Sequence, residues 1–163
     1  MLKFKQYGDW AKAGTVLRGL SSKGHVTTAF RATVDKNGKI IRDKLVGHID
    51  AQDLNWKPLS EHTIKLKHGN STIYVETGTL KKGIRARRIS APSNGYSLFI
   101  GCAPQAHNKD GSKLSDIMIY LEYGTVHNPA RPLIRPTWDE VKAQVKEDMR
   151  KTLRGLIRGE IGG

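Results

Sequence analysis

The sequence has one cysteine, few aromatic residues and no long apolar run. Cys102 lies inside the apolar stretch YSLFIGCA. Since a single cysteine cannot form an internal disulfide, we expect Cys102 to be a small buried side chain. No stretch approaches the ~18 apolar residues of a membrane span. The N-terminal residues MLKFKQYGDW lack the apolar core of a signal peptide, so we expect a protein of the reducing cytoplasm without membrane contact.

Motifs of catalysis and metal binding are missing as well. None of the six histidines has metal-ligand spacing on a predicted helix, and HExxH does not occur. The stretch GTLKKG lacks the Gly-Lys-Ser/Thr ending of a phosphate-binding loop, and no serine or cysteine lies in a nucleophile-elbow motif. We therefore expect no enzymatic activity, no catalytic or metal-binding residues and no cofactor. An enzyme with an unfamiliar active site stays an alternative.

Positive charge is the strongest feature that is present. The 163 residues carry 28 basic and 15 acidic side chains, a formal net charge of +13. Such an excess is suited to a polyanion such as nucleic acid, or to an acidic protein partner. The length predicts one domain over residues 1–163, with a core of modest size because the apolar fraction is 37%.

Basic residues form two clusters. The stretch KKGIRARR provides candidate contacts with DNA or an acidic partner, namely Lys81, Lys82, Arg85, Arg87 and Arg88. Without interleaved aromatic residues, the cluster indicates contact with a phosphate backbone and not base stacking. The second cluster recurs every four residues on the predicted C-terminal helix, at Lys142, Lys146, Arg150, Arg154 and Arg158. Either cluster is also compatible with a solvated face, and exposed cations protect an edge strand from pairing.

The first half of the chain mixes strand and helix patterns. Alternation in LKFKQY predicts a short strand, and Asp9 can cap a helix over residues 10–20. Residues 25–49 allow a hairpin turning at Asn37-Gly38, but a helical apolar pattern continues past that turn. We favour a helix, bent near Gly38. A loop then leads into a short helix that begins after Ser60.

The second half predicts a hairpin and two helices. Asn94-Gly95 is a hairpin turn between strands at about 83–90 and 96–102, and the apolar second strand is expected to be central in its sheet. The polar residues 104–114 predict a mobile loop. A short helix over 117–123, capped by Ser115 or Asp116, stops at Gly124. Glu122 on this helix is interpreted as a helix-surface or salt-bridge residue. A long amphipathic helix then starts near Pro136, with Thr137 and Glu140 at capping-box spacing, and the tail 159–163 frays. The apolar residues that recur at three- or four-residue steps and predict its core-facing side are Trp138, Val141, Val145, Met149, Leu153 and Leu156.

These elements predict an α+β fold, in which helices pack on a small and mostly antiparallel sheet. Between the last two helices lies the link segment, residues 124–136. Its three prolines stiffen the backbone, and Arg131 and Arg135 are expected to project from it. A stiff, exposed and cationic link suits contact with a neighbouring protein, although a plain rigid connector is the alternative.

The sequence around the link segment resembles a known family. LEYGTVHNPARPLIRPTWDE is similar to the signature of tailed-bacteriophage neck and tail-completion proteins, with matches at Glu122, Tyr123, Gly124, Thr125, Pro129, Ala130, Arg131, Pro132, Leu133, Ile134, Arg135 and Pro136. An earlier stretch resembles a pattern of related virion-morphogenesis proteins, with matches at Trp56, Pro58, Leu59, Ser60, Thr63, Ile64, Lys67, Thr77, Gly78 and Leu80. The chain departs from the family in a longer loop at 104–113 and a higher positive charge.

The resemblance implies a structural protein of the virion, found in the host cytoplasm during assembly. Such proteins have a fold similar to tail-terminator subunits, act where the tail meets the head, and commonly form rings, often hexamers. Implied partners are further copies of the chain, tail-terminator or tail-tube subunits, head–tail connector proteins, and the DNA that passes through. The implied contact residues are Glu122, Tyr123, Gly124, Thr125, Pro129, Arg131, Pro132 and Arg135. A basic nucleic-acid-binding domain without sequence specificity is the alternative function.

Overall fold

The chain was analysed as a computed structural model that describes residues 23–89 and 96–158. These residues form five helices and one two-stranded antiparallel sheet. In chain order they are α2 (Lys23–Ala51), α3 (Glu61–Leu66), α4 (Thr79–Gly83), β1 (Arg85–Ile89), β2 (Ser97–Gly101), α5 (Leu114–Tyr123) and α6 (Ile134–Arg158). The α+β prediction is confirmed, including the long C-terminal helix. The strand predicted at 2–7, the helix at 10–20 and the frayed tail at 159–163 lie outside the described residues.

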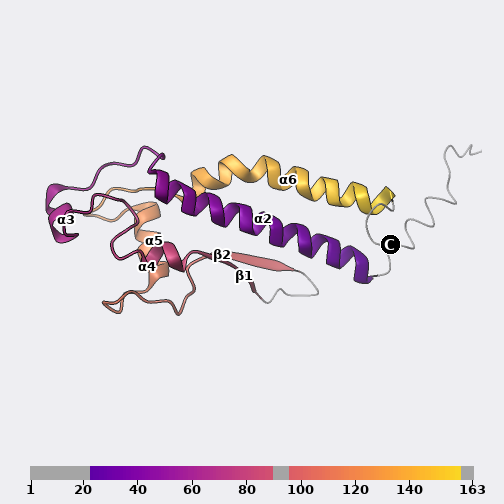
Figure 1. Cartoon of the computed structure of the whole chain (residues 1–163), viewed down its shortest axis with the longest axis horizontal. Coiled ribbons are helices and arrows are strands. Elements are labelled where there is room, and N and C mark those ends of the chain that lie inside the picture. The colour runs from indigo at the N-terminus through magenta and orange to yellow at the C-terminus, as the bar shows by residue number, and fades with distance from the viewer. Residues whose placement is uncertain (1–22, 90–95, 159–163) are drawn as a thin grey trace, which may run out of the picture.

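The two long helices and the hairpin stack in three layers, which we call the arm. Helix α2 lies between α6 on one side and the hairpin β1–β2 on the other (Figure 1). The two helices are antiparallel, because Thr33 near the start of α2 bonds Thr152 near the end of α6, at 2.6 Å between their hydroxyl oxygens. Ion pairs continue the contact along the helices, from Lys36–Asp148 to Lys44–Glu140.

Residues 25–49 are helical, as favoured, and the hairpin alternative is wrong. Helix α2 continues through Asn37 and Gly38. Gly38 serves close packing here, because a Cβ atom at this position would lie 1.9 Å from the Cδ2 atom of Leu98 on strand β2. The glycine that sequence rules treat as a helix breaker therefore lets the sheet approach the helix closely.

The hairpin is confirmed, with Arg85 opposite Gly101 and Ile89 opposite Ser97. Its predicted turn at Asn94-Gly95 lies outside the described residues. The prediction that the second strand is central is wrong, since the sheet in the described part of the chain contains β1 and β2 alone. The apolar side chains of β2 have a different cause: the strand packs against α2.

Helix α6 is amphipathic as expected, but its buried face includes residues other than the predicted apolar ones. Val141 and Leu156 face inward as predicted, together with the small residues Thr137, Thr152 and Gly155. Trp138 and Leu153, expected in the core, are 44% and 45% exposed. The small side chains allow α2 and α6 to lie close together, and this moves the larger apolar side chains to the flank.

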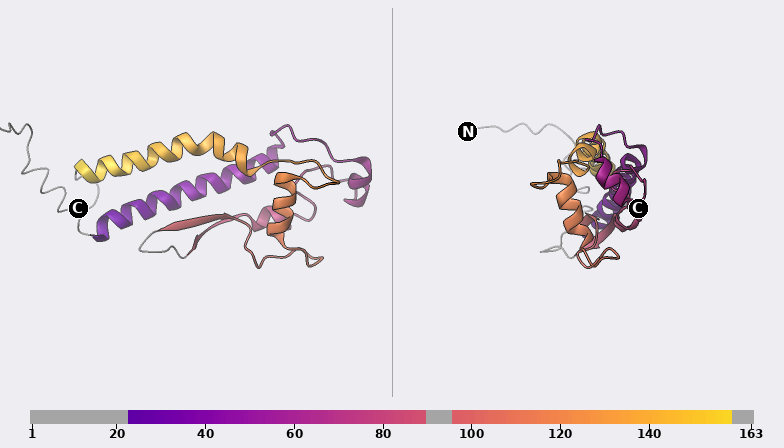
Figure 2. Two further views of the ribbon diagram at one scale, coloured as in Figure 1. Left: turned by 180° about the vertical axis from the view of Figure 1, so that it is seen from behind. Right: turned by 90° about the vertical axis from the view of Figure 1, so that its left-hand side faces the viewer.

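The remaining elements gather at one end of the arm, which we call the junction end. It contains α3, α4, α5 and the link segment, packed around the last turns of α2 (Figure 2). Its core includes Ile49, Ile84 and Leu133, each with 0% exposure, and Cys102 with 2%. The 2% exposure of Cys102 confirms the expected buried side chain, and this burial raises the pKa of its thiol to about 11. Among the described helices, none is long and apolar enough to cross a membrane.

Of the two helix caps predicted at the junction end, that of α3 is confirmed and that of α5 is wrong. Ser60 caps α3, because its hydroxyl oxygen accepts a hydrogen bond from the Thr63 amide at 3.2 Å. Helix α5 begins at Leu114 after an N-cap at Lys113 that forms no side-chain cap, so neither Ser115 nor Asp116 caps it as predicted. The polar loop before α5 closes on itself, with the Asn108 amide donating to the Ser112 carbonyl at 2.8 Å. Its mobility stays a prediction.

Candidate functional site

Glu122 ties the end of α5 to the start of α6. Its carboxylate accepts hydrogen bonds from three successive backbone amides, those of Leu133 (2.6 Å), Ile134 (2.9 Å) and Arg135 (3.1 Å). These are among the amides that a helix N-terminus leaves without internal partners. The positive end of the helix dipole also favours a carboxylate there. At 8% exposure, Glu122 is therefore a buried cap supplied by another helix.

Helix α6 begins at Ile134, so Pro136 lies in its first turn as predicted. Two other predictions about this region are wrong. Thr137 and Glu140 form no capping box, because Thr137 is already inside the helix and its hydroxyl donates to the Leu133 carbonyl at 2.6 Å. Glu122, interpreted as a helix-surface or salt-bridge residue, is instead buried and engaged with backbone amides.

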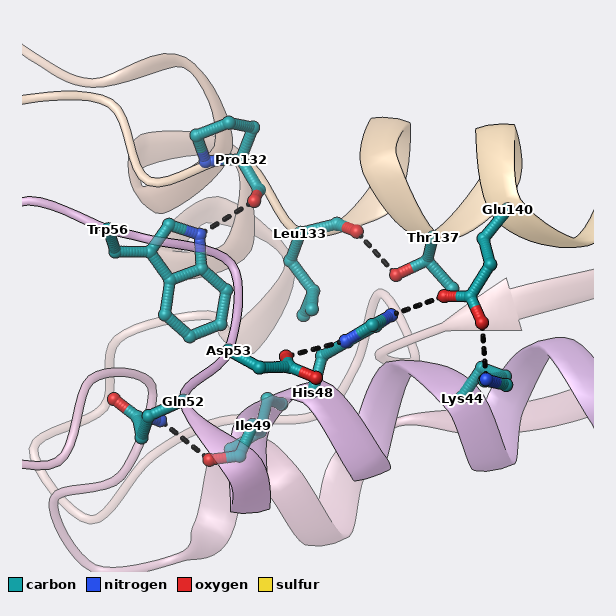
Figure 3. Close-up of polar contacts among 10 residues, drawn as sticks. All are labelled: Lys44, His48, Ile49, Gln52, Asp53, Trp56, Pro132, Leu133, Thr137 and Glu140. Carbon is teal, nitrogen blue, oxygen red and sulfur yellow. Dashed lines mark hydrogen bonds and ion pairs between the residues drawn. The ribbon is translucent and has the colours of Figure 1, made fainter.

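Arg131 is also buried, at 5% exposure, so the prediction that it projects from the link segment is wrong. Its guanidinium donates to the carbonyls of Lys57 (2.8 Å) and Pro58 (3.2 Å). Its own carbonyl accepts the Tyr74 hydroxyl at 2.7 Å. The next carbonyl, that of Pro132, accepts the Trp56 indole N–H at 2.7 Å (Figure 3). The link segment is thus a junction that holds the 56–58 loop, Tyr74 and two helices together.

The outer part of the link segment is a fixed turn. Gly124 has a φ of +78°, and a Cβ atom there would lie 2.7 Å from the Ala130 backbone nitrogen. The turn closes with the Thr125 amide donating to the Asn128 carbonyl at 2.8 Å. The other predicted contact residues are exposed, namely Tyr123, Thr125, Pro129, Pro132 and Arg135. Their contact with a partner stays a prediction.

A cavity of about 320 Å³ lies beside this turn. The two sequence stretches that carry the family resemblance converge on it. The earlier stretch lines it with Leu59, Thr63, Lys67, Thr77, Gly78 and Leu80. The link segment adds Thr125, Pro129 and Arg131, and α5 adds Tyr120 and Leu121. The volume is in the range of small-ligand pockets, about 300–1,000 Å³. The sequence pattern alone gave no indication that these residues share one pocket.

Polar groups lie among the apolar walls of this pocket. Lys67 donates from Nζ to the Thr72 carbonyl at 2.6 Å, and burial lowers the pKa of its ammonium group. Asn108 contributes a buried Oδ1 atom without a hydrogen-bond partner. Tyr74 has a φ of +66°, which is strained for an aromatic residue. Backbone strain of this kind clusters at functional sites, because the surrounding structure must hold it in place.

A second, basic groove lies between α2 and β1 in the arm. Five cations and two carboxylates line it: Lys39, Arg42, Arg85, Arg87 and Arg88 against Asp35 and Asp43. Arg88 pairs with Asp35 at 2.7 Å, and this hydrogen bond holds the pKa of Asp35 below its usual range. Arg87 stacks over the Phe99 ring, with 5.3 Å from Cζ to the ring centroid. The groove therefore keeps a positive excess after its internal pairs.

The predicted basic cluster is divided between this groove and its surroundings. Arg85, Arg87 and Arg88 line the groove, whereas Lys81 pairs with Asp50 and Lys82 is exposed on α4. Lys39 and Arg42, which belong to neither predicted basic cluster, complete the groove from α2. Their spacing places them on one helix face with Asp35, but only the packing of β1 against α2 shows that this face is basic.

A buried histidine links the end of α2 to the start of α6. His48 is 9% exposed, and its ring lies between the carboxylates of Asp53 (2.7 Å to Nδ1) and Glu140 (3.0 Å to Nε2), as Figure 3 shows. Lys44 also bonds Glu140. The bond from His48 holds the pKa of Asp53 below its usual range. Within residues 23–89 and 96–158, no group of three His, Cys, Asp or Glu residues is arranged to hold a metal ion.

Comparison of the chain with protein-family models, curated proteins and solved structures found no match.

Proposed function

We propose that this chain is a structural virion protein of a tailed phage that acts at the head–tail junction, in tail completion or in the neck. Its copies assemble as a ring around the DNA passage and contact tail-terminator or tail-tube subunits and connector proteins. The protein is made in the host cytoplasm and remains in the virion, without catalytic activity, cofactor or membrane contact. In this proposal the fold is related to that of tail terminators.

The observation that carries the proposal is the different chemistry of the two outer layers of the arm. The hairpin side of α2 carries the basic groove. On the other side of α2, the flank of α6 exposes large apolar side chains, with Trp138 at 44%, Leu153 at 45% and Ile157 at 47%. A basic face suits DNA and an apolar flank suits a protein neighbour, which is the combination that a ring subunit around DNA needs.

The link segment has a modified role in this proposal. Glu122 and Arg131 hold the segment from inside. Tyr123 at the end of α5, 79% exposed, and Val126 in the fixed turn, 97% exposed, are thereby presented to a neighbour. Because the turn is already closed by its own hydrogen bonds, little conformational entropy is lost when it docks.

Deletion of the gene from its parent phage, followed by negative-stain imaging of the lysate, tests this function. The expected result is filled heads lying apart from tails, or tails of irregular length. Supplying the intact gene from a plasmid should restore joined particles, and this control separates the loss of the protein from effects on neighbouring genes. Normal, joined and infectious particles in the deletion lysate would rule the proposal out.

The basic groove favours a second candidate, a nucleic-acid-binding domain without sequence specificity. The isolated subunit would then bind duplex DNA with a steep salt dependence, because each phosphate contact releases counterions. Removing two groove cations, as Lys39→Ala with Arg85→Ala, should lower both the affinity and the salt slope. The matched control is Lys146→Ala with Arg150→Ala on α6, across α2 from the groove. Equal losses in the two double variants would indicate overall charge and not a groove.

A further inference from the structure

We propose that the pocket beneath the link-segment turn binds a peptide segment of a partner protein that carries a carboxylate side chain next to apolar residues. The inference rests on the pocket alone and not on the proposed function. Its walls are mostly apolar, and Arg131 and Lys67 line them with two cations against the one carboxylate of Glu76.

The charge of Arg131 is the first argument. The side chain is buried, and the bonds described for its guanidinium go to the neutral carbonyls of Lys57 and Pro58. Among the described residues, no carboxylate forms an ion pair with it within 4.0 Å. Glu122 is buried in the same junction, but its carboxylate is engaged with the α6 amides. Buried charges in proteins are usually paired, so Arg131 favours an anion from outside.

Two further polar side chains of the pocket, those of Lys67 and Asn108, also favour a peptide ligand. Lys67 has its ammonium group partly buried, with one described hydrogen bond, to the Thr72 carbonyl. An ammonium group can donate three hydrogen bonds. Asn108 adds a buried oxygen without a partner, which can accept a hydrogen bond from a backbone amide of the same ligand. Donors for a carboxylate and an acceptor for an amide together match a peptide.

Two kinds of protein could occupy such a pocket, a second copy of this chain or a different protein, and charge favours the different protein. A second copy of this chain carries a net charge of +13, so its surface complements a cationic pocket less well than an acidic surface does. An acidic segment of a different protein is attracted instead. The apolar walls, including Leu59, Leu80 and Leu121, select for an acidic residue with apolar neighbours over a uniformly acidic stretch.

A peptide titration of the full chain tests the inference. The probe is acetyl-Leu-Glu-Leu-amide, and the control is acetyl-Leu-Gln-Leu-amide, which has the same shape without the charge. Amide chemical shifts recorded by ¹H–¹⁵N NMR should respond saturably to the Glu peptide at pocket residues such as Thr77, Leu121 and Asn128. We expect the Glu peptide to bind about tenfold more tightly than the Gln peptide. Equal affinities, or the absence of saturable binding, would overturn the proposal.

Matched variants separate the pocket from its surroundings. Tyr120 lines the pocket, whereas Tyr123 on the same helix does not, so Tyr120→Ala should weaken the Glu peptide and Tyr123→Ala should not. Lys67 and Lys65 form a second pair, of which only Lys67 lines the pocket. Lys67→Gln should reduce the preference for the Glu peptide, and Arg131 should maintain the remainder. If Lys65→Gln removes as much, the peptide is held by overall charge and the proposal is wrong. These variants leave Arg131 and its structural bonds intact.

Discussion

The junction end and the arm are held together by different kinds of interaction. At the junction end, buried side chains bond directly to backbone groups of distant segments, as Glu122, Arg131 and Tyr74 do. In the arm, the polar contacts between α2 and α6 are mainly ion pairs at the surface, such as Lys36–Asp148, with 63% of the lysine side chain exposed. The arm also buries the Asn37 amide at 3% exposure without a hydrogen-bond partner for either polar atom.

The two regions therefore differ in how firmly their geometry is determined. A buried carboxylate or guanidinium with several fixed partners allows one arrangement, because any shift leaves a buried group without a hydrogen bond. Exposed ion pairs contribute about 0–1 kcal/mol each and tolerate small shifts. We therefore expect the junction end to present a fixed surface and the arm to adjust when its flank and groove meet partners.

Removing the Glu122 carboxylate should have the largest effect. Glu122→Ala leaves three α6 amides without their acceptor in a buried site, and we expect a loss of about 3–5 kcal/mol in the free energy of unfolding. Urea denaturation followed by circular dichroism measures this loss. The control Glu147→Ala, at a carboxylate paired with Arg150 and Arg154 on exposed α6, should cost less than about 1 kcal/mol. Equal losses would contradict the difference between the regions.

A smaller loss is expected from one hydroxyl group. Tyr74→Phe removes the donor to the Arg131 carbonyl inside the junction end, and the unfolding free energy should fall by about 1–2 kcal/mol. Tyr120→Phe, at a hydroxyl on a 56% exposed side chain, should change it by less than about 0.5 kcal/mol. A Tyr74→Phe variant as stable as the parent chain would mean that the junction does not depend on this bond.

Replacing an asparagine by leucine should change the unfolding free energy in opposite directions at Asn37 and at Asn70. Asn37→Leu in the arm removes a buried amide without partners, and should raise the unfolding free energy by about 1 kcal/mol. Asn70→Leu should lower it by about 1 kcal/mol, because the Asn70 side chain bonds the Thr72 amide and the Val75 carbonyl. Thermal unfolding of the two variants measures both changes. A loss at Asn37 as large as that at Asn70 would show that Asn37 has a partner in solution.

The smallest effect concerns pH and the contact between α2 and α6. The pKa of Asp53 is lowered mainly by its hydrogen bond to His48, and that of Glu140 mainly by its bond to Lys44. Because the folded chain favours the charged forms, their contribution is present above the unfolded-state pKa values, about 4. It is lost as the pH falls through the lower folded-state values. Denaturation midpoints should therefore drop below about pH 4, and less steeply in Asp53→Asn. If the midpoint of Asp53→Asn falls with pH as steeply as that of the parent chain, the bond between Asp53 and His48 does not contribute to this pH dependence.

The sequence predicts the elements that depend on local signals. The α2 periodicity, the Asn-Gly hairpin, the Ser60 cap and the amphipathic pattern of α6 each correspond to an observed element. It does not reveal partners that are distant in the chain. The residues near Glu122 do not indicate that its carboxylate accepts hydrogen bonds from amides 11 to 13 residues later. Likewise, the residues near Arg131 do not indicate that its guanidinium donates to the carbonyls of residues 57 and 58. Glu122 and Arg131 were therefore expected at the surface, where charges usually lie.

Native-state hydrogen exchange of three amides tests the account most directly. Leu133, Ile134 and Arg135 sit at a helix N-terminus, where amides normally lack internal partners and exchange fast. If the Glu122 carboxylate holds them as described, their exchange in the intact chain should be as slow as that of the core amide of Ile49. Glu122→Gln should accelerate all three together while the Gly155 amide in α6 keeps its rate. Fast exchange of the three amides in the parent chain would contradict the buried junction.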